Sequence, residues 1–573
     1  MILQALYDYY QRCGNLPRMG TEMKEIGFLI VIDREGRFLR FEDRRIDKKQ
    51  AQRFLVKKHV GRTSALAANH LYDNSGYVLG YSDKNDAKAQ YEAFKEKVSE
   101  IFERHPDNPD ILAVYKFYQQ DQSKVIKELQ SDPLWPEIVK NLNKKYSTFS
   151  FLLQGETRIV AEIGELLEID NDKKGMERRV CLVTGKKAAT VETTTATMIP
   201  GSQATAKLVA FQVSSGYDSY GKSKGWNAPI SEEAEFAFTT ALNHLLEPES
   251  RNKFIIGSRT FLFWASKNDE AGRETEECFL NLFGFNEQND DPNRNIDQVR
   301  KVFESLYKGM LKTTSEDRFY ILGLAPNSAR IAVTYWAEIP IRKFAETICK
   351  HFDDMEVIDT RIDKKPYMSL RNIVSSVTLG GKVSDATPNL ADAVVKSIFE
   401  GLPYPQTLFS SCIRRIRAES GGKEKNPIYI TRAAIIKAYL NRVNNNNQTI
   451  QTMLDKANIN QGYLCGRLFA VLEKIQEEAN NQHSIRERYM NSASSTPAAV
   501  FSTILNLSNH HIENIRNEGR KTYFEKLKQE IVSKIDADGF KAQLDLQDQG
   551  RFFIGYYHQR QDFFAKYEES NNE

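Results

Sequence analysis

Residues 206–229 read AKLVAFQVSSGYDSYGKSKGWNAP, and the interpretation of the whole chain depends on them. An apolar run at residues 208–213 predicts a strand that leads into a glycine-rich loop. The loop matches the spacing G-x-x-x-x-G-K-S, which cradles phosphates in nucleotide hydrolases. The four residues that make the match are Gly216, Gly221, Lys222 and Ser223. The first question is therefore whether this chain is an NTPase.

A phosphate cradle needs a helix that begins at the Lys-Ser pair, because the free N–H groups and the positive end of the helix hold the phosphates. Gly225 and Pro229 disfavour a helix there. Ser231 is a good N-cap, and Glu232 and Glu233 follow it, so a helix is expected to start near Ser231. That start lies several residues too late for a cradle. The P-loop-type NTPase is kept as the alternative hypothesis.

The composition is that of a folded globular protein. The chain has 573 residues, of which 41% are hydrophobic and 27% charged. This length predicts about three or four domains or one large irregular one. The net charge of +3 leaves room for a local basic groove that binds nucleic acid. No apolar run is long enough for a membrane span and no signal peptide is recognisable, so we expect a cytoplasmic protein without membrane contact.

Chemistry-bearing clusters are not apparent in the sequence. The six cysteines are scattered without C-x-x-C spacing, which predicts reduced and mostly buried thiols. His510 and His511 are adjacent and face different directions, so they make a poor metal pair. Neither a Ser/His/Asp arrangement nor a pair of carboxylates can be placed together. We therefore expect no catalytic residue, no metal and no cofactor, and not an enzyme.

The first part of the chain predicts mixed helices and strands. Residues 1–12 predict a short helix, and residues 27–41 predict a hairpin. A turn at residues 73–76 precedes an apolar run that predicts a strand at residues 77–81. Further strand pairs are expected at residues 251–265 and 319–336, and a helix follows from Ile341.

After Pro427 the pattern is helical nearly throughout. Apolar residues recur at helical spacing, as expected for a helix of an antiparallel bundle: Leu464, Leu468, Val471 or Leu472, and Ile475. The predicted fold class is therefore α+β. We expect a large mixed region of antiparallel sheets and helices over residues 1–420, with a division near residues 130–150 left open, and an all-α helical bundle over residues 427–573.

Three groups of residues suit nucleic acid. Cations and hydroxyls that can contact phosphates lie upstream of an amide, Asn74, that can contact a base edge. These cations and hydroxyls are Lys57, Lys58, Arg62 and Ser64. The second group interleaves aromatic, cationic and amide side chains at Gln203, Ser219, Tyr220, Lys222, Lys224 and Asn227. The third group is Arg414, Arg415 and Arg417.

Each group also has a plain structural explanation. The first group could be a solvated charged loop, and the second a structural loop with aromatic anchors. The three arginines could satisfy the carbonyls at the end of a helix. Both explanations stay open for each group.

Five stretches together resemble the large subunit of the type I-C CRISPR interference complex (Cascade), the Csd family. They are CLVTGK at residues 181–186, the run from KLVAF to ISEEA at residues 207–234, LYDNSGYVLG at residues 71–80, FYILGLAPNSARIAV at residues 319–333 and YLCGRLFAVLEKIQ at residues 463–476. The resemblance covers nearly the whole chain in the expected order. In this family Ser-Tyr-Gly followed by Asn-Ala-Pro is the pattern, so the Lys-Ser pair lies inside a family motif.

The resemblance implies a non-catalytic subunit of an RNA-guided surveillance complex in antiviral defence. Such a subunit recognises the protospacer-adjacent motif (PAM) in duplex DNA, promotes unwinding and R-loop formation, and helps to recruit a helicase-nuclease. The implied partners are the guide crRNA, the target double-stranded DNA, the Cascade backbone subunits, the crRNA-processing subunit at the 5′ end and the small subunits.

The resemblance also suggests roles for residues. Asn74 is the candidate for base-edge contact, while Lys57, Lys58 and Arg62 are candidates for phosphates. Gln203 and residues 220–227 are candidates for duplex contact or strand separation. The C-terminal bundle is expected to line the displaced strand and to be made separately as the small subunit, with Met453 as the candidate internal start of a product over residues 453–573.

Overall fold

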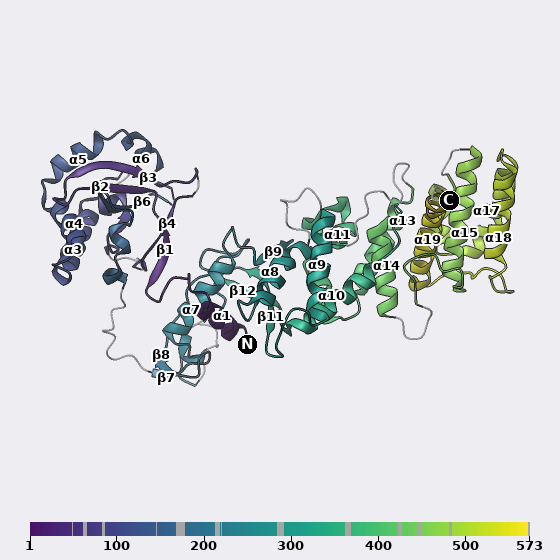
Figure 1. The fold of residues 1–573 in the computed structure, drawn as a ribbon, viewed down its shortest axis with the longest axis horizontal. Helices are drawn as coiled ribbons and strands as arrows, with labels where there is room; N and C mark the ends of the chain where they lie inside the picture. Colours follow the sequence, from purple (N-terminus) through teal and green to yellow (C-terminus); the bar gives the residue numbers. More distant parts are fainter. Residues whose placement is uncertain are drawn as a thin grey trace. The chain divides into compact units, whose positions relative to one another are not determined.

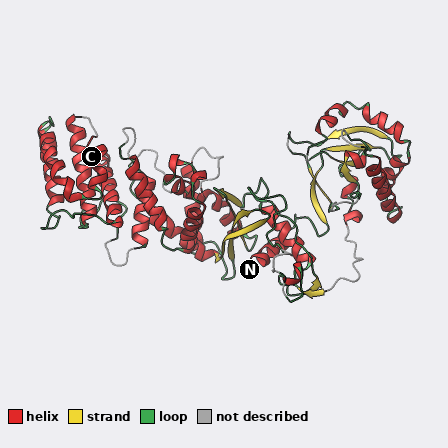
Figure 2. Cartoon of the chain, turned by 180° about the vertical axis from the view of Figure 1, so that it is seen from behind, coloured by secondary structure: helices red, strands yellow, loops and turns green. Residues whose placement is uncertain are grey.

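The computed structural model describes residues 1–48, 50–60, 66–82, 86–144, 146–167, 178–211, 218, 220–283, 292–360, 368–421, 427–443, 449–480 and 484–570. The chain forms two compact units. The smaller unit comprises Cys13–Val191 and Ala228–Thr240, and the larger unit comprises Met1–Arg12, Glu192–Asn227 and Ala241–Glu573. The fold class is α+β, as predicted. The described strands all precede the helix α10 (Ile341–Met355), and helices follow it (Figures 1 and 2).

The smaller unit contains a four-stranded sheet in the order β3-β2-β6-β5. Its strands are β3 (Phe38–Asp43), β2 (Phe28–Ile32), β6 (Thr148–Leu153) and β5 (Tyr72–Asn74). The hairpin predicted at residues 27–41 is confirmed as the antiparallel pair β2 and β3, and β2 pairs in parallel with β6. Every residue of β2 and β6 is buried, because both faces of these strands are covered.

Helices and two ribbons complete the smaller unit. Phe117 of α4 lies edge-on to Phe151 of β6, with ring centroids 5.4 Å apart, so α4 covers the sheet. The helices are α3 (Lys88–Arg104), α4 (Pro109–Gln119), α5 (Gln122–Gln130), α6 (Trp135–Asn141), η1 (Val160–Glu162) and η2 (Gly164–Leu167). The ribbons pair β1 (Thr21–Glu25) with β4 (Arg53–Lys57) and β7 (Arg178–Val180) with β8 (Lys187–Ala189).

The strand predicted at residues 77–81 is wrong, because the short helix α2 (Ser75–Val78) begins here. The side-chain oxygen of Asn74 accepts hydrogen bonds from the backbone N–H groups of Gly76 and Tyr77 and caps this helix. A Cβ on Gly76 would lie 2.0 Å from Oε1 of Gln90, so the end of this flexible side chain of α3 packs directly against the glycine. The apolar run is buried throughout, and such a run does not distinguish a buried helix from a strand.

The larger unit contains an antiparallel sheet in the order β12-β11-β10-β9. The two predicted strand pairs are confirmed and join in this sheet as β9 (Lys253–Ile256), β10 (Arg259–Ala265), β11 (Arg318–Asn327) and β12 (Arg330–Pro340). Phe319 of the sheet stacks on Phe344 of α10 at 4.8 Å and contacts Phe279 of α8 (Glu270–Phe283) at 5.0 Å between centroids. These aromatic contacts hold the helices on one face of the sheet.

Helices make up most of the larger unit. α1 (Ile2–Arg12) confirms the predicted first helix, and α7 (Glu232–Leu245) contributes residues to both units. The other helices are α8 (Glu270–Phe283), α9 (Pro292–Tyr307), α11 (Leu370–Ser376), α12 (Pro388–Glu400), α13 (Gln406–Glu419), α14 (Ile430–Arg442), α15 (Gln461–Asn480), α16 (Ser484–Ala493), α17 (Pro497–Glu513), α18 (Glu518–Val532) and α19 (Leu546–Ser570), with the short 3₁₀ turns η3 (Lys224–Asn227), η4 (Leu379–Gly381) and η5 (Val383–Asp385).

The helix α15 forms the centre of the C-terminal helices. It packs along α19 and also contacts α16, α17 and α18 (Figure 1). The predicted stripe is confirmed, since Leu464, Leu468, Leu472 and Ile475 are each fully buried. This stripe is therefore core rather than a ligand-binding surface.

The strand predicted at residues 208–213 is also wrong over its described part, residues 208–211. Lys207 makes one isolated parallel bridge with Arg330, and the ladder does not continue. The hydroxyl of Thr194 donates to the carbonyl of Val209, so a side chain takes a position that a strand partner would occupy. The helix predicted near Ser231 is confirmed as α7. Ser231 Oγ accepts a hydrogen bond of 3.2 Å from the backbone N–H of Ala234 in its first turn.

Candidate nucleic-acid interface

A cavity of about 450 Å³ in the smaller unit collects polar and cationic side chains around Asn74. Its basic side chains come from three separate segments, as Lys24 lies on β1, His59 follows β4 and Lys144 follows α6. Three amide side chains, those of Asn69, Asn74 and Asn143, also line it. Ammonium groups suit phosphates and amides suit base edges. The lining also contains Asp73, whose two carboxylate oxygens accept from the backbone N–H groups of Asn74 and Asn69, so the lining as a whole still suits a nucleic acid.

The side chain of Asn74 is exposed and rigidly oriented. Its oxygen caps α2, with hydrogen bonds of 3.0 Å from Gly76 N and 3.4 Å from Tyr77 N. Its own backbone N–H donates to Asp73 Oδ1 at 2.9 Å, and the other oxygen of Asp73 accepts from Asn69 N at 3.0 Å. No described residue hydrogen-bonds to Nδ2 of Asn74. The capping bond therefore leaves the amide donor as the end that can contact a ligand.

The predicted phosphate contacts Lys57 and Lys58 lie at the end of β4 in the same unit. The carbonyl oxygen of Lys57 accepts from the Tyr72 hydroxyl at 2.8 Å, and Lys58 N donates to the carbonyl of Gly20 at 2.7 Å. The ammonium of Lys58 lies 5.9 Å from the centroid of the Phe236 ring. These contacts fix the segment that leads into His59, and His59 itself lines the cavity. Arg62 and Ser64 lie outside the described residues.

Glu22 is the carboxylate nearest to His59, at 2.8 Å from its Nδ1. Burial alone would raise the pKa of Glu22, but the hydrogen bond and charge of His59 and the charge of Lys24 outweigh burial and lower the pKa below its usual value. Glu22 therefore stays ionised and is hydrogen-bonded to His59, and the charge of Lys24 partly offsets its repulsion of an approaching phosphate.

The second predicted group lies in the larger unit. Some of its residues make contacts within the loop, and others are exposed to solvent. Asp218 Oδ1 accepts from Lys224 N at 3.1 Å and from Asn227 Nδ2 at 3.0 Å, and the Lys224 ammonium pairs with Glu192. Lys224 and Asn227 therefore hold the loop together. Tyr220, in contrast, is 97% exposed, and Lys222 is also exposed.

The remaining members of the second group are Gln203 and Ser219. Gln203 is exposed, and its backbone N–H donates to the carbonyl of Ser328 at 3.3 Å. Ser219 lies outside the described residues. The structure places Gln203 in the larger unit together with Tyr220 and Lys222.

The geometry disagrees with the NTPase alternative. No helix begins at Lys222 or Ser223, and the 3₁₀ turn η3 that follows spans only Lys224–Asn227. The next helix, α7, begins at Glu232. The described part of the match therefore lacks the helix N-terminus that would hold phosphates. Gly216 lies outside the described residues.

The third group lies on α13 and is largely engaged in packing helices. Arg415 pairs with Glu419, which also binds Arg432 of α14. Arg417 Nη1 lies 3.4 Å from Gln549 Oε1 of α19. Arg414 is exposed, with Nη2 bonded to Ser411 Oγ at 3.0 Å. Of the three arginines, Arg414 presents its side chain to solvent most fully.

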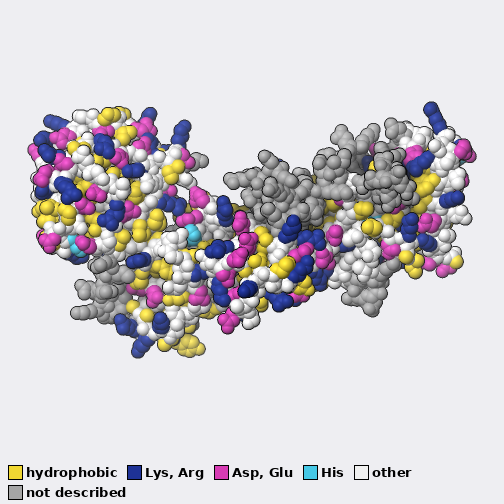
Figure 3. All heavy atoms as spheres, viewed as in Figure 1, with side chains coloured by type: hydrophobic (Ala, Val, Ile, Leu, Met, Phe, Trp, Pro, Cys, Tyr) yellow, Lys and Arg dark blue, Asp and Glu magenta, His cyan; other side chains and the backbone are white. Residues whose placement is uncertain are grey.

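Sequence reasoning missed two cations of the cavity, Lys24 and Lys144. They are far apart in the chain and meet only because β1 and the segment after α6 border the same space. Lys24 stands alone between Met23 and Glu25, and Lys144 belongs only to a pair of lysines at residues 144–145. Lys and Arg side chains lie at many places on the face seen in Figure 3, so a positive charge alone does not mark these two residues.

Metal ligands do not gather in the part of the chain that the structure describes. No group of three or more His, Cys, Asp or Glu side chains among these residues could hold a metal ion. None of the described helices is both long and apolar enough to cross a membrane.

A model of one protein family, described as CRISPR-associated protein (Cas_Csd1), matches residues 6–564. No curated protein matches the chain.

Proposed function

Because the chain belongs to the Csd1 family of CRISPR-associated proteins, the large subunits of Cascade, we propose that it reads the PAM of duplex DNA as the non-catalytic large subunit of a type I-C complex. In this role it promotes unwinding and R-loop formation in the cytoplasm and helps to recruit a helicase-nuclease. Its partners are the guide crRNA, the target DNA, the backbone subunits, the 5′-end processing subunit and the small subunits.

The observation that carries this proposal is the fixed orientation of Asn74 in a cationic cavity. Its oxygen is held by Gly76 N and Tyr77 N, which leaves Nδ2 to donate to an acceptor on a base edge. Lys24 and Lys144 line the same cavity and can neutralise the flanking phosphates. A fixed donor between cations is the arrangement that reads a short motif while the backbone is held.

The test is binding of the assembled complex to a library of duplexes that carry its target with randomised flanking bases. Asn74→Ser is the informative variant, because serine also caps a helix but cannot extend an amide donor. We expect α2 to stay capped, and the preference for the motif to fall by about 1–3 kcal/mol at the contacted position. Affinity for unrelated flanks should change little.

Asn108→Ser is the matched control. Asn108 caps α4 in the same unit, with Oδ1 accepting from Asp110 N at 3.1 Å and Ile111 N at 3.2 Å, and it does not line the cavity. This variant should keep full motif preference. Equal binding of all flanks by the wild-type complex would refute the recognition role. A preference that survives Asn74→Ser would refute only the assignment of Asn74.

The proposal includes a separate product that starts at Met453. Met453 is 57% exposed and precedes α15, so a chain over residues 453–573 would keep α15 to α19 complete. Expression of the gene with a C-terminal tag should give a short product of this size. A short product that is absent, or that persists unchanged in Met453→Ala, would contradict this start.

A further inference from the structure

A second cavity, of about 520 Å³, lies in the smaller unit and shares Lys144 with the cavity around Asn74. Two further lysines, Lys48 and Lys140, line it. Lys48 belongs to the loop after β3, and Lys140 belongs to α6. The two cavities are therefore neighbours that share one cationic side chain.

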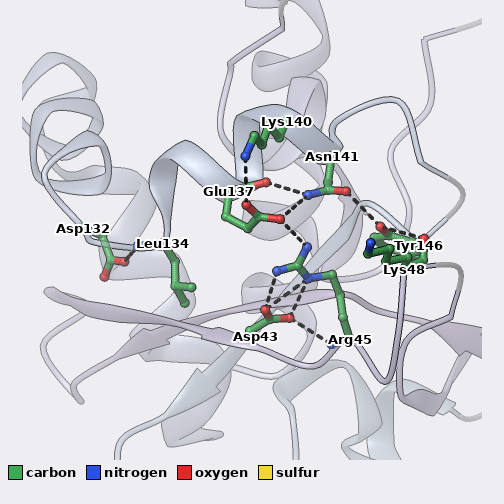
Figure 4. A network of polar contacts seen from close by, with 9 residues as sticks. All are labelled: Asp43, Arg45, Lys48, Asp132, Leu134, Glu137, Lys140, Asn141 and Tyr146. Carbon is green, nitrogen blue, oxygen red and sulfur yellow. Dashed lines mark hydrogen bonds and ion pairs between the residues drawn. The ribbon is translucent and has the colours of Figure 1, made fainter.

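A polar network fixes the walls of the second cavity (Figure 4). Arg45 binds Asp43 through Nε at 2.9 Å and Nη2 at 2.6 Å, and its Nη1 donates to Glu137 Oε1 of α6 at 2.9 Å. Asn141 Nδ2 donates to the same Glu137 oxygen at 3.1 Å, and the Tyr146 hydroxyl donates to Asn141 Oδ1 at 2.9 Å. The loop that bears Lys48 and the helix that bears Lys140 are thus held together by Arg45.

This network also decides the charge that the cavity presents. The hydrogen bonds and charge of Arg45 lower the pKa of Asp43 below its usual value, so Asp43 stays ionised and paired. Glu137 is paired with Arg45 and lies 3.8 Å from the ammonium of Lys140. Lys48 and Lys144 make no ion pair with any described residue. A third acid of the lining, Asp47, accepts a hydrogen bond from Gln50 N at 2.8 Å. The acids are therefore engaged, while two ammonium groups remain to bind an anion.

We propose that Lys48, Lys140 and Lys144 bind the phosphodiester backbone of the same DNA duplex whose motif is read at the cavity around Asn74. This inference rests on the proposed function, and it extends the contact of the duplex from one cavity to the next through Lys144. The ligand is a polyanion rather than a single phosphate, because three lysines line this cavity and one of them, Lys144, also lines the neighbouring cavity around Asn74. Arg45 is a positioning residue that keeps the lysine-bearing segments in place.

The experiment measures the affinity of the assembled complex for its motif-bearing duplex over a range of salt concentrations. Lys48→Gln and Lys144→Gln each remove one ammonium without leaving a buried charge. The slope of log K against log salt should fall by about one in magnitude for each phosphate that the variant no longer neutralises. The motif preference should stay unchanged, since a phosphate contact carries no sequence information.

Lys124→Gln is the matched control, because Lys124 is an exposed lysine on α5 of the same unit that lines neither cavity. Its slope should equal that of the wild type. If the slopes of Lys48→Gln and Lys144→Gln match this control while the wild-type complex still prefers its motif, the inference is wrong and the proposed function stands. Loss of guide RNA from the Lys48→Gln complex would also overturn it, because the cavity would then serve RNA. Absence of motif preference in the wild type would instead overturn the proposed function.

Discussion

Gly466 of α15 approaches α19 so closely that a Cβ on it would lie 1.9 Å from the carbonyl oxygen of Phe552. Gly462 and Gly555 mark further close approaches between these helices. A Cβ on Gly462 would lie 2.4 Å from the carbonyl oxygen of Asp548, and a Cβ on Gly555 would lie 2.3 Å from the carbonyl oxygen of Tyr463. Three backbone contacts of this kind set the spacing of the helix pair, because backbone atoms cannot move aside as a flexible side chain can.

Gly466→Ala should therefore destabilise the C-terminal helices. Overpacking of this kind costs about 1–3 kcal/mol, and a contact with backbone places it toward the upper end. Chemical denaturation monitored by circular dichroism measures the loss of stability. Gly421→Ala is the control, since a Cβ there meets nothing within 4 Å. Equal stability of the two variants would show that α15 and α19 shift apart at no cost.

Tyr556→Phe should also destabilise these helices. The hydroxyl of Tyr556 donates to Glu473 of α15, and both side chains are fully buried. A hydrogen bond to a buried charge contributes about 1.5–3 kcal/mol. Tyr489→Phe in α16 removes a hydroxyl that has no hydrogen bond with a described residue, so it should have little effect on the free energy of unfolding. If the two variants lose equal stability, the buried hydrogen bond contributes nothing of its own.

The pair of Glu419 and Arg432 should make stability depend on pH. Arg432 donates to both oxygens of Glu419, at 2.6 and 3.0 Å. Burial alone would raise the pKa of Glu419, but the hydrogen bonds and charge of Arg432 outweigh it and lower the pKa below 4.5. The stabilisation by this pair is therefore complete above pH 4.5 and is lost as the pH falls through the lowered pKa.

Glu419→Gln tests this dependence. The variant should be less stable than the wild type at neutral pH, and the difference should shrink as the pH falls below about 4. The measurement is the free energy of unfolding of both proteins across this range. A difference that stays constant with pH would mean that the charge of Glu419 does not stabilise the fold.

Lys222 and Lys224 offer a comparison within one loop. Lys222 is exposed and makes no ion pair with a described residue, whereas Lys224 pairs with Glu192. We expect Lys222→Ala to weaken duplex binding by the assembled complex without changing motif preference, and Lys224→Ala to weaken it less. Competition binding at fixed salt measures both. A larger decrease in Lys224→Ala would reverse the roles of the two lysines, and loss of an ATPase activity in Lys222→Ala would revive the NTPase alternative.

Local sequence patterns sufficed to predict the elements whose caps and apolar residues lie close together in the chain. The late start of α7 follows from Ser231 and the residues just before it, and it already argued against a phosphate cradle. The strand predicted at residues 77–81 failed because the side chain of Asn74, rather than the apolar pattern, decides that a helix starts there.

The candidate interface, in contrast, depends on contacts between segments that are far apart in the chain. The sequence alone indicated the α+β class and the C-terminal helices, and it singled out Asn74 as a candidate for base contact, since these depend on periodicity, capping chemistry and short motifs. Only the tertiary structure brings Lys24, Asn74 and Lys144 to one cavity and engages Lys224 with Glu192. Such meetings depend on how distant segments pack, and the spacing of residues along the chain does not record them.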